Sequence, residues 1–198
     1  MRNLFRLIIA LTLFVTSTVA QARSISDDPA VLADMYKNPM HYVHIGDDNF
    51  GMTYYLDITG IYVHEYSPPD YIIACTEVYH HRTYIDGADE EQAGYASDRT
   101  TRYKYNYASR EMYVEKYDSA GNPRWEYLPP LSDEQQRKMS GGVLRGYERL
   151  VAQGEIAFFV AYGISFYEQP ATTASENFIV HGRSRMIPLL KLDLSDTE

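Results

Sequence analysis

Between residues 41 and 128, apolar and polar side chains alternate along the chain with a period of two. Such alternation is typical of strands that bury one face, and these runs are rich in Tyr, Ile, Val and Thr. Clusters of Gly, Pro, Asn and Asp separate the runs, which favours tight turns and antiparallel pairing. The predicted strands cover residues 42–45, 52–58, 61–66, 71–79, 101–107, 111–117 and 124–128.

Two places interrupt this alternation. Thr59–Gly60 marks a turn or a bulge between two of the runs. Residues 86–99 are rich in carboxylates and contain two glycines, so we expect an exposed acidic loop there. The carboxylates are those of Asp86, Asp89, Glu90, Glu91 and Asp98. They suggest calcium, but their spacing does not match the Asp-x-Asp-x-Asp-Gly loop with its closing Glu, and a solvated loop fits better.

The pattern changes to a helical one after Pro129–Pro130. Ser132 and Gln135 are spaced as a capping box, which predicts a helix starting there. Gly141–Gly142 weakens the helix interior and predicts a kink or a short break. Residues 156–167 are almost all apolar but too few to span a membrane, so they indicate a buried helical segment. Near the end, residues 178–181 favour a last strand.

Strands first and helices last predict the α+β class, with a twisted antiparallel β-sheet and the C-terminal helices packed on one face. The predicted organisation has four parts. They are a secretory signal peptide at 1–22, a lead-in at 23–40 with a short helix, a single domain at 41–168 with strands to about 128 and helices at 132–168, and a linker and docking tail at 169–198.

The first 22 residues have the features of a secretory signal. Arg2 and Arg6 precede an apolar stretch at 7–20, and Ala20-Gln21-Ala22 has the small-x-small pattern of a cleavage site. The alternative is a membrane anchor, but a spanning helix needs about 20 apolar residues. We therefore expect a protein secreted across the cytoplasmic membrane, periplasmic or at the cell surface, without stable membrane insertion after cleavage.

Charge and cysteine content exclude several classes. The net charge is −9, and it becomes −11 when Arg2 and Arg6 leave with the signal, which argues against nucleic acid as a partner. A single cysteine excludes an intramolecular disulfide framework and a cysteine-built zinc site. Cys75 lies in a predicted strand and is interpreted as a buried, inert side chain. An intermolecular disulfide and a nucleophilic thiol are the alternatives.

No catalytic motif is present. The sequence lacks a Gly-x-Ser-x-Gly elbow, a phosphate-binding loop, a dinucleotide fingerprint and a zinc-protease helix. Among the six histidines, His41 and His44 point to opposite faces of a strand, and the adjacent His80 and His81 also diverge. We therefore predict no catalytic residue, no cofactor and no metal site, and we consider an enzyme unsupported.

Tyrosine is the one composition feature above background, with 19 residues against seven Phe and one Trp. Tyr103, Tyr105 and Tyr107 share one face of a predicted strand and are the candidate ligand-binding residues. They can form an exposed platform for a sugar, a peptide or a partner protein. Alternatively they pack beneath the C-terminal helices while Arg102 and Lys104 face water. We favour this second interpretation, because an alternating strand normally turns its aromatic face to the core.

Two segments resemble a known family. Residues 47–58 (Asp-Asp-Asn-Phe-Gly-Met-Thr-Tyr-Tyr-Leu-Asp-Ile) and 117–130, with its Gly turn, Trp strand and Pro exit, resemble small secreted domains similar to bacterial surface-adhesin protein E. The order of features matches from about 41 to 167. The resemblance implies an antiparallel sheet with a packed helix and an adhesion or ligand-binding role without catalysis. Members often carry paired cysteines, whereas this chain has one.

The sequence therefore predicts a non-catalytic secreted binding or adhesion module, whose partner is a host or envelope protein or a glycan. Two alternatives stay open. One is a structural envelope protein that self-associates through a sheet edge or Cys75. The other is a secreted hydrolase that uses a histidine and the abundant carboxylates. The pattern does not define the oligomeric state.

Overall fold

The computed structural model describes residues 41–83, 92–139 and 141–182. The predicted signal peptide, the lead-in with its short helix and the final part of the C-terminal tail lie outside the described residues.

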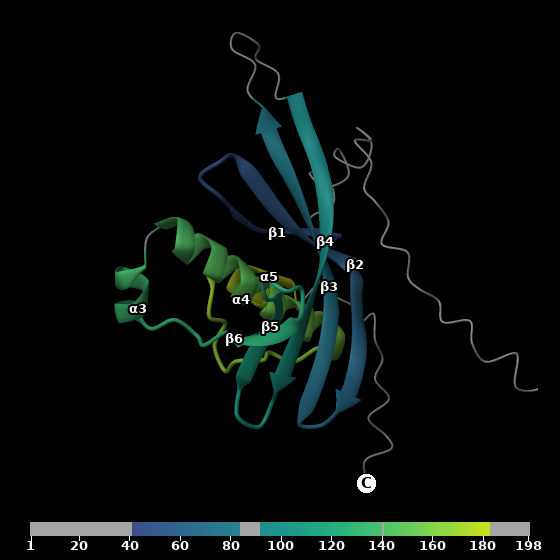
Figure 1. Ribbon diagram of the computed structural model, residues 1–198. Coiled ribbons are helices and arrows are strands. Elements are labelled where there is room, and N and C mark those ends of the chain that lie inside the picture. Colours follow the sequence, from purple (N-terminus) through teal and green to yellow (C-terminus); the bar gives the residue numbers. More distant parts are fainter. Residues whose placement is uncertain (1–40, 84–91, 140, 183–198) are drawn as a thin grey trace, which may run out of the picture.

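A six-stranded antiparallel sheet dominates the molecule (Figure 1), and its spatial order β1-β2-β3-β4-β5-β6 is the order along the chain. Each strand therefore pairs with its neighbours in sequence. The strands are β1 Tyr42–Asp47, β2 Met52–Ser67, β3 Asp70–Thr83, β4 Gln92–Asn106, β5 Glu111–Tyr117 and β6 Pro123–Tyr127. The predicted antiparallel sheet is thus confirmed.

Strand β2 is a single strand with an irregularity where a turn or bulge was expected. The β2–β3 register shifts between Asp57 and Tyr62. Asp57 Oδ1 accepts hydrogen bonds from the backbone N–H of Thr59 (2.8 Å) and of Gly60 (3.3 Å), which satisfies the donors that leave the ladder. The predicted interruption is therefore a bulge inside one strand.

Strand β4 starts earlier than the sequence pattern indicated. Residues 92–99, predicted as part of an acidic loop, continue the pairing with β3, up to Thr83 opposite Gln92. Because β3 is long, its backbone groups need partners at this end, and the extended β4 supplies them. The prediction of a loop through residue 99 was wrong for this part, and residues 84–91 lie outside the described structure.

Three helices follow the sheet: α3 Asp133–Lys138, α4 Gly141–Tyr162 and α5 Thr173–Gly182. The gap between α3 and α4 confirms the break expected near Gly141. Helix α4 ends at Gly163, whose φ of 69° and N–H bond to the Phe159 carbonyl (2.7 Å) form a left-handed cap. The helical prediction to residue 168 was therefore too long, although Phe166 and Tyr167 are buried as expected.

Helix α5 replaces the strand predicted at 178–181. The backbone N–H of Ser175 bonds to Thr172 Oγ1 (3.1 Å), which caps the first turn. Phe178 and Ile179 then lie buried against the body. A short apolar run does not by itself distinguish a strand from a helix, and here the capping residues decide.

A buried carboxylate joins α5 to α4. Glu155 of α4 is almost fully buried and accepts hydrogen bonds from the Ala171 N–H (3.0 Å) and from the Ser175 hydroxyl (2.5 Å). Burial raises the pKa of Glu155 to about 7, although both hydrogen bonds act in the opposite direction. Glu155 therefore holds the start of α5 with a group that titrates near neutral pH.

The core lies between α4 and the sheet. Figure 1 shows α4 and α5 on one side of the sheet and α3 farther away from it. Every residue of α4 from Val151 to Ala161 is buried. Gly154 permits the close approach, since a Cβ placed there would lie 2.4 Å from Met112 Sδ and 3.0 Å from Tyr103 Cδ1. The α+β class with helices packed on one face of the sheet is confirmed.

Candidate functional site

The three candidate tyrosines of β4 belong to the core. Tyr103 and Tyr105 are fully buried, and their hydroxyls donate to Gln153 Oε1 (3.0 Å) and to the Gly154 carbonyl (2.9 Å). Tyr107 is half-buried and stacks on Phe158, with ring centroids 5.6 Å apart. The structure thus places this ladder beneath α4, as the favoured interpretation has it, and these residues form no exposed platform.

Exposed aromatic side chains lie instead on the opposite face of the sheet. Because Met112 and Val114 are buried under α4, Tyr113 between them must point the other way. Cross-strand pairing places Tyr113 opposite Tyr127 and Glu115 opposite Trp125. We call this face the outer aromatic surface, and it consists of Tyr62, Arg102, Tyr113, Tyr117, Trp125 and Tyr127.

Arg102 lies at the centre of the outer aromatic surface. Its guanidinium forms an ion pair with Glu115, and its Cζ lies 5.9 Å from the ring centroid of Trp125. Nη1 of Arg102 is 3.4 Å from His64 Nε2, and the His64 ring meets Tyr62 edge-on at 5.9 Å. Contacts through Arg102 therefore connect β2, β4, β5 and β6.

The remaining rings extend the surface along β5 and β6. Tyr113 and Tyr127 are tilted together with centroids 5.3 Å apart. Partial desolvation and the Glu111 carboxylate raise the pKa of Tyr113, so its hydroxyl stays protonated and donates to Glu111 Oε2 (3.3 Å). Tyr117 is 64% exposed and donates to Glu115 Oε2 (3.2 Å). These rings are oriented by their neighbours while a large part of their surface remains in water.

An open hollow of about 500 Å³ lies between β4, β5 and α4 and borders the outer aromatic surface. Arg102, Glu115 and Tyr117 of that surface line it, and so do Arg99 and, from the α4 side, Val114 and Leu150. Trp125 beside it is 36% exposed. Tyr, Trp and Arg are the residues that carry most binding energy in protein interfaces. This face can therefore receive both a flat partner surface and an inserted side chain.

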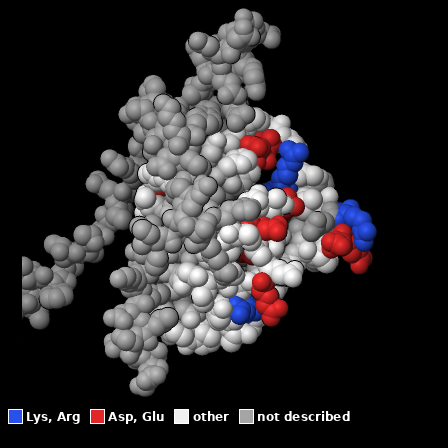
Figure 2. All heavy atoms as spheres, turned by 180° about the vertical axis from the view of Figure 1, so that it is seen from behind, with Lys and Arg blue, Asp and Glu red and all other residues white. Residues whose placement is uncertain are grey.

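Charge does not dominate the face seen from behind. Figure 2 shows basic and acidic residues lying next to one another among neutral atoms in the described part of that face. Among the described residues, oppositely charged side chains also pair locally: Lys138 lies 2.5 Å from Glu134, and Arg124 lies 3.8 Å from Glu126.

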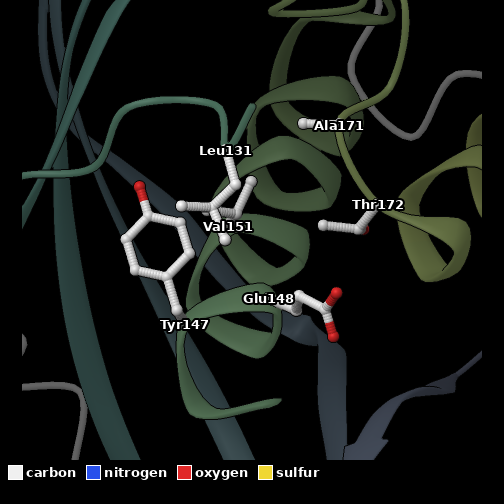
Figure 3. A pocket seen from close by; sticks show the side chains of 6 residues that line it. All are labelled: Leu131, Tyr147, Glu148, Val151, Ala171 and Thr172. Carbon is white, nitrogen blue, oxygen red and sulfur yellow. The ribbon is translucent and has the colours of Figure 1, made fainter. Parts of the chain in front are cut away.

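A smaller hollow of about 220 Å³ lies between α4 and the segments before α3 and α5. In Figure 3, Leu131 and Val151 lie near its middle, with the Tyr147 ring on one side and Thr172 on the other. The Tyr147 hydroxyl donates to the Pro129 carbonyl. The Tyr147 hydroxyl in this hollow therefore already has a partner within the chain, whereas the Glu148 carboxylate lines the hollow as a second polar group.

One cluster at β1 and β2 combines a histidine, a carboxylate and a hydroxyl. His41 Nε2 lies 3.2 Å from Asp57 Oδ1 and 3.1 Å from Thr59 Oγ1. However, Thr59 Oγ1 donates directly to Asp57 Oδ1 (2.7 Å). In a catalytic triad the two ring nitrogens of the histidine separate the acid from the nucleophile. The cluster instead closes the bulge of β2.

Metal binding finds no support in the part of the chain that the structure describes. Among those residues, no group of three His, Cys, Asp or Glu side chains is placed to hold an ion.

Within the described ranges, no helix combines the length and apolar character needed to cross a membrane.

The free edge of the sheet at β6 has features that discourage strand pairing. All five residues of β6 are exposed, and Pro123, Arg124 and Glu126 are among them. Proline and charged side chains on edge strands commonly prevent edge-to-edge association.

Cys75 is fully buried, so a disulfide between copies would require the core to open.

Comparison with known proteins gave no match. No family model, curated protein or solved structure matches the chain.

Proposed function

We propose that the chain is a non-catalytic, extracytoplasmic binding module that docks a protein partner on the outer aromatic surface. The observation that carries the proposal is the set of exposed rings grouped around Arg102 on the sheet face opposite α4. The predicted secretory signal supports a partner outside the cytoplasm, at the host or in the envelope.

The chemistry of the surface favours a protein over a small molecule. Small ligands are usually enclosed in concave sites, whereas these rings lie on three strands, β2, β5 and β6, and Arg102 on a fourth. Tyr and Trp offer large contact area with little loss of conformational entropy. The resemblance to surface-adhesin protein E implies the same kind of role, and the sheet with packed helices is the architecture expected for it.

The outer aromatic surface is tested by Trp125→Ala. Labelled mature protein is bound to envelope fractions, immobilised matrix proteins and a glycan array. We expect saturable binding to a protein component and a loss of at least about tenfold in affinity for the variant, because truncation of a central Trp typically costs about 2 kcal/mol or more.

Phe50→Ala provides the matched control, since Phe50 is 83% exposed in the β1–β2 turn, away from the outer aromatic surface. This variant should bind like the wild type. An equal loss in both variants, or binding only to glycans, would contradict the proposal.

A further inference from the structure

A separate hollow lies on the α4 side of the sheet. Its empty volume is about 360 Å³, and its lining residues come from β2, β3, β4 and α4. They are Met52, Tyr54, Glu77, Tyr79, Arg99 and Arg149. None of these six residues belongs to the outer aromatic surface, although Arg99 also lines the hollow that borders it.

Two arginines share one buried carboxylate in this hollow. Glu77 is fully buried, and its Oε1 accepts a hydrogen bond from Arg99 Nη2 (2.9 Å). Its Oε2 lies 3.2 Å from Arg149 Nε, yet neither of these two atoms has a hydrogen-bond partner within the described structure. A buried carboxylate is costly and rarely a net source of stability, so this arrangement calls for another explanation.

Arg149 is held in place from a second side. Its Cζ lies 3.6 Å from the ring centroid of Tyr54, and the Tyr54 hydroxyl donates to Asp48 Oδ2 (2.9 Å). Burial alone would raise the pKa of Asp48, but backbone N–H groups of Met52 and Phe50 bond to its carboxylate and lower it. Asp48 is therefore ionised and fixes Tyr54, which in turn fixes the plane of the guanidinium.

The two guanidinium groups differ in access to water. Arg149 is 17% exposed in its side chain, whereas Arg99 is 54% exposed. Each guanidinium has five N–H donors, and Glu77 engages one of those on Arg99. Arg99 is the more exposed of the two, so its guanidinium is the one that an incoming ligand reaches first.

We propose that this hollow binds an organic carboxylate through guanidinium N–H groups of Arg99 and Arg149 that Glu77 does not engage, with the apolar part of the ligand against Tyr79 and Met52. Guanidinium groups match the planar carboxylate with paired hydrogen bonds. Because Glu77 and Tyr54 already hold the arginines, little side-chain entropy remains to be lost on binding.

The test uses benzoate as the probe and benzamide as its uncharged counterpart. We expect benzoate to shift the side-chain Nε–H resonances of Arg99 and Arg149 saturably in the wild-type protein, and benzamide to leave them unchanged. Arg99→Ala should weaken benzoate binding by at least about tenfold. Arg124→Ala, which removes the same charge from exposed β6, should bind like the wild type.

Three results would overturn the proposal. They are the absence of a saturable shift with benzoate, an equal shift with benzamide, and an equal loss in Arg124→Ala. Tighter binding of inorganic phosphate than of benzoate would overturn the assignment to a carboxylate. The wild-type resonances decide the question even if Arg99→Ala fails to fold.

Discussion

Gly154 shows how a single missing side chain sets the distance between α4 and the sheet. The position lies inside a helix, where alanine is normally more stable than glycine by about 1 kcal/mol. Here a Cβ would meet Met112 Sδ at 2.4 Å and the buried Tyr103 ring at 3.0 Å. The gain in helix propensity and the steric clash therefore act in opposite directions at the same residue.

We predict that Gly154→Ala lowers the free energy of unfolding by about 1–3 kcal/mol, because overpacking of a rigid core outweighs helix propensity. Urea denaturation followed by circular dichroism measures this difference. Gly146→Ala in the same helix is the control, since nothing lies within 4 Å of its added Cβ. That variant should gain up to about 1 kcal/mol. Stabilisation in both variants would show that α4 can move away from the sheet without cost.

At this scale the sequence predicts which side chains share a face but not what they meet. Alternation correctly places Tyr103 and Tyr105 inward and Arg102 outward. It does not reveal that Trp125 lies beside Arg102, because that contact depends on the registers of two further strand pairs. The buried position of Glu77 could have been predicted, since it shares the inward face of its strand with Cys75 and Tyr79.

Among the elements, the junction of α4 and α5 depends on the ionisation of Glu155. Its pKa of about 7 in the folded protein lies above its ordinary value of 4.5. The folded protein therefore holds this proton more tightly than the unfolded chain does. The contribution of the protonated Glu155 to the free energy of unfolding is complete below about pH 4.5 and is lost as the pH rises through about 7.

We predict that Glu155→Gln removes this pH dependence. Relative to the variant, the wild type should lose about 3 kcal/mol of unfolding free energy between pH 4.5 and pH 8. Urea denaturation of both proteins at a series of pH values measures the difference. Glu148→Gln, two turns earlier in the same helix, should keep the wild-type dependence. Parallel curves for wild type and Glu155→Gln would exclude Glu155 as the titrating group.

The sequence predicts the elements themselves unevenly. The inward and outward alternation located all strands of the sheet, since tight turns and period-two patterns are local properties. The start of β4 was missed because its pairing is dictated by the length of β3. Helix α5 was predicted as a strand because its apolar run is short, and the capping by Thr172 was not recognised.

For the molecule as a whole, Cys75 reports whether the core is closed. The thiol is fully buried, and burial together with the Glu77 carboxylate raises its pKa. Thiols react as thiolates, so the lack of solvent access and the suppressed ionisation both protect the Cys75 thiol from reaction. The side chain also lies 3.4 Å from Gln153 Nε2 of α4, which places it under the helix.

We predict that iodoacetamide does not label native Cys75 and labels it at one equivalent per chain in denaturant. Mass spectrometry after timed exposure measures the extent of labelling. In a Cys75→Ser background, Ser109→Cys at the exposed β4–β5 turn should react rapidly in the native state. Fast labelling of native Cys75 would mean that the sheet and α4 separate readily, and it would make a disulfide between copies accessible.

The meander of strands has an evolutionary consequence. Every strand from β2 to β5 contributes alternate residues to two faces, so the positions that hold α4 and those that contact a partner are different sets in the same segments. Selection on one set leaves the other free to change. Descendants of a common ancestor can therefore keep Tyr103 and Tyr105 of β4 and Met112 of β5 while Arg102 and Tyr113 of the same two strands diverge. Sequence similarity between such chains would then be concentrated at the inward-facing positions, which are every second residue of each strand.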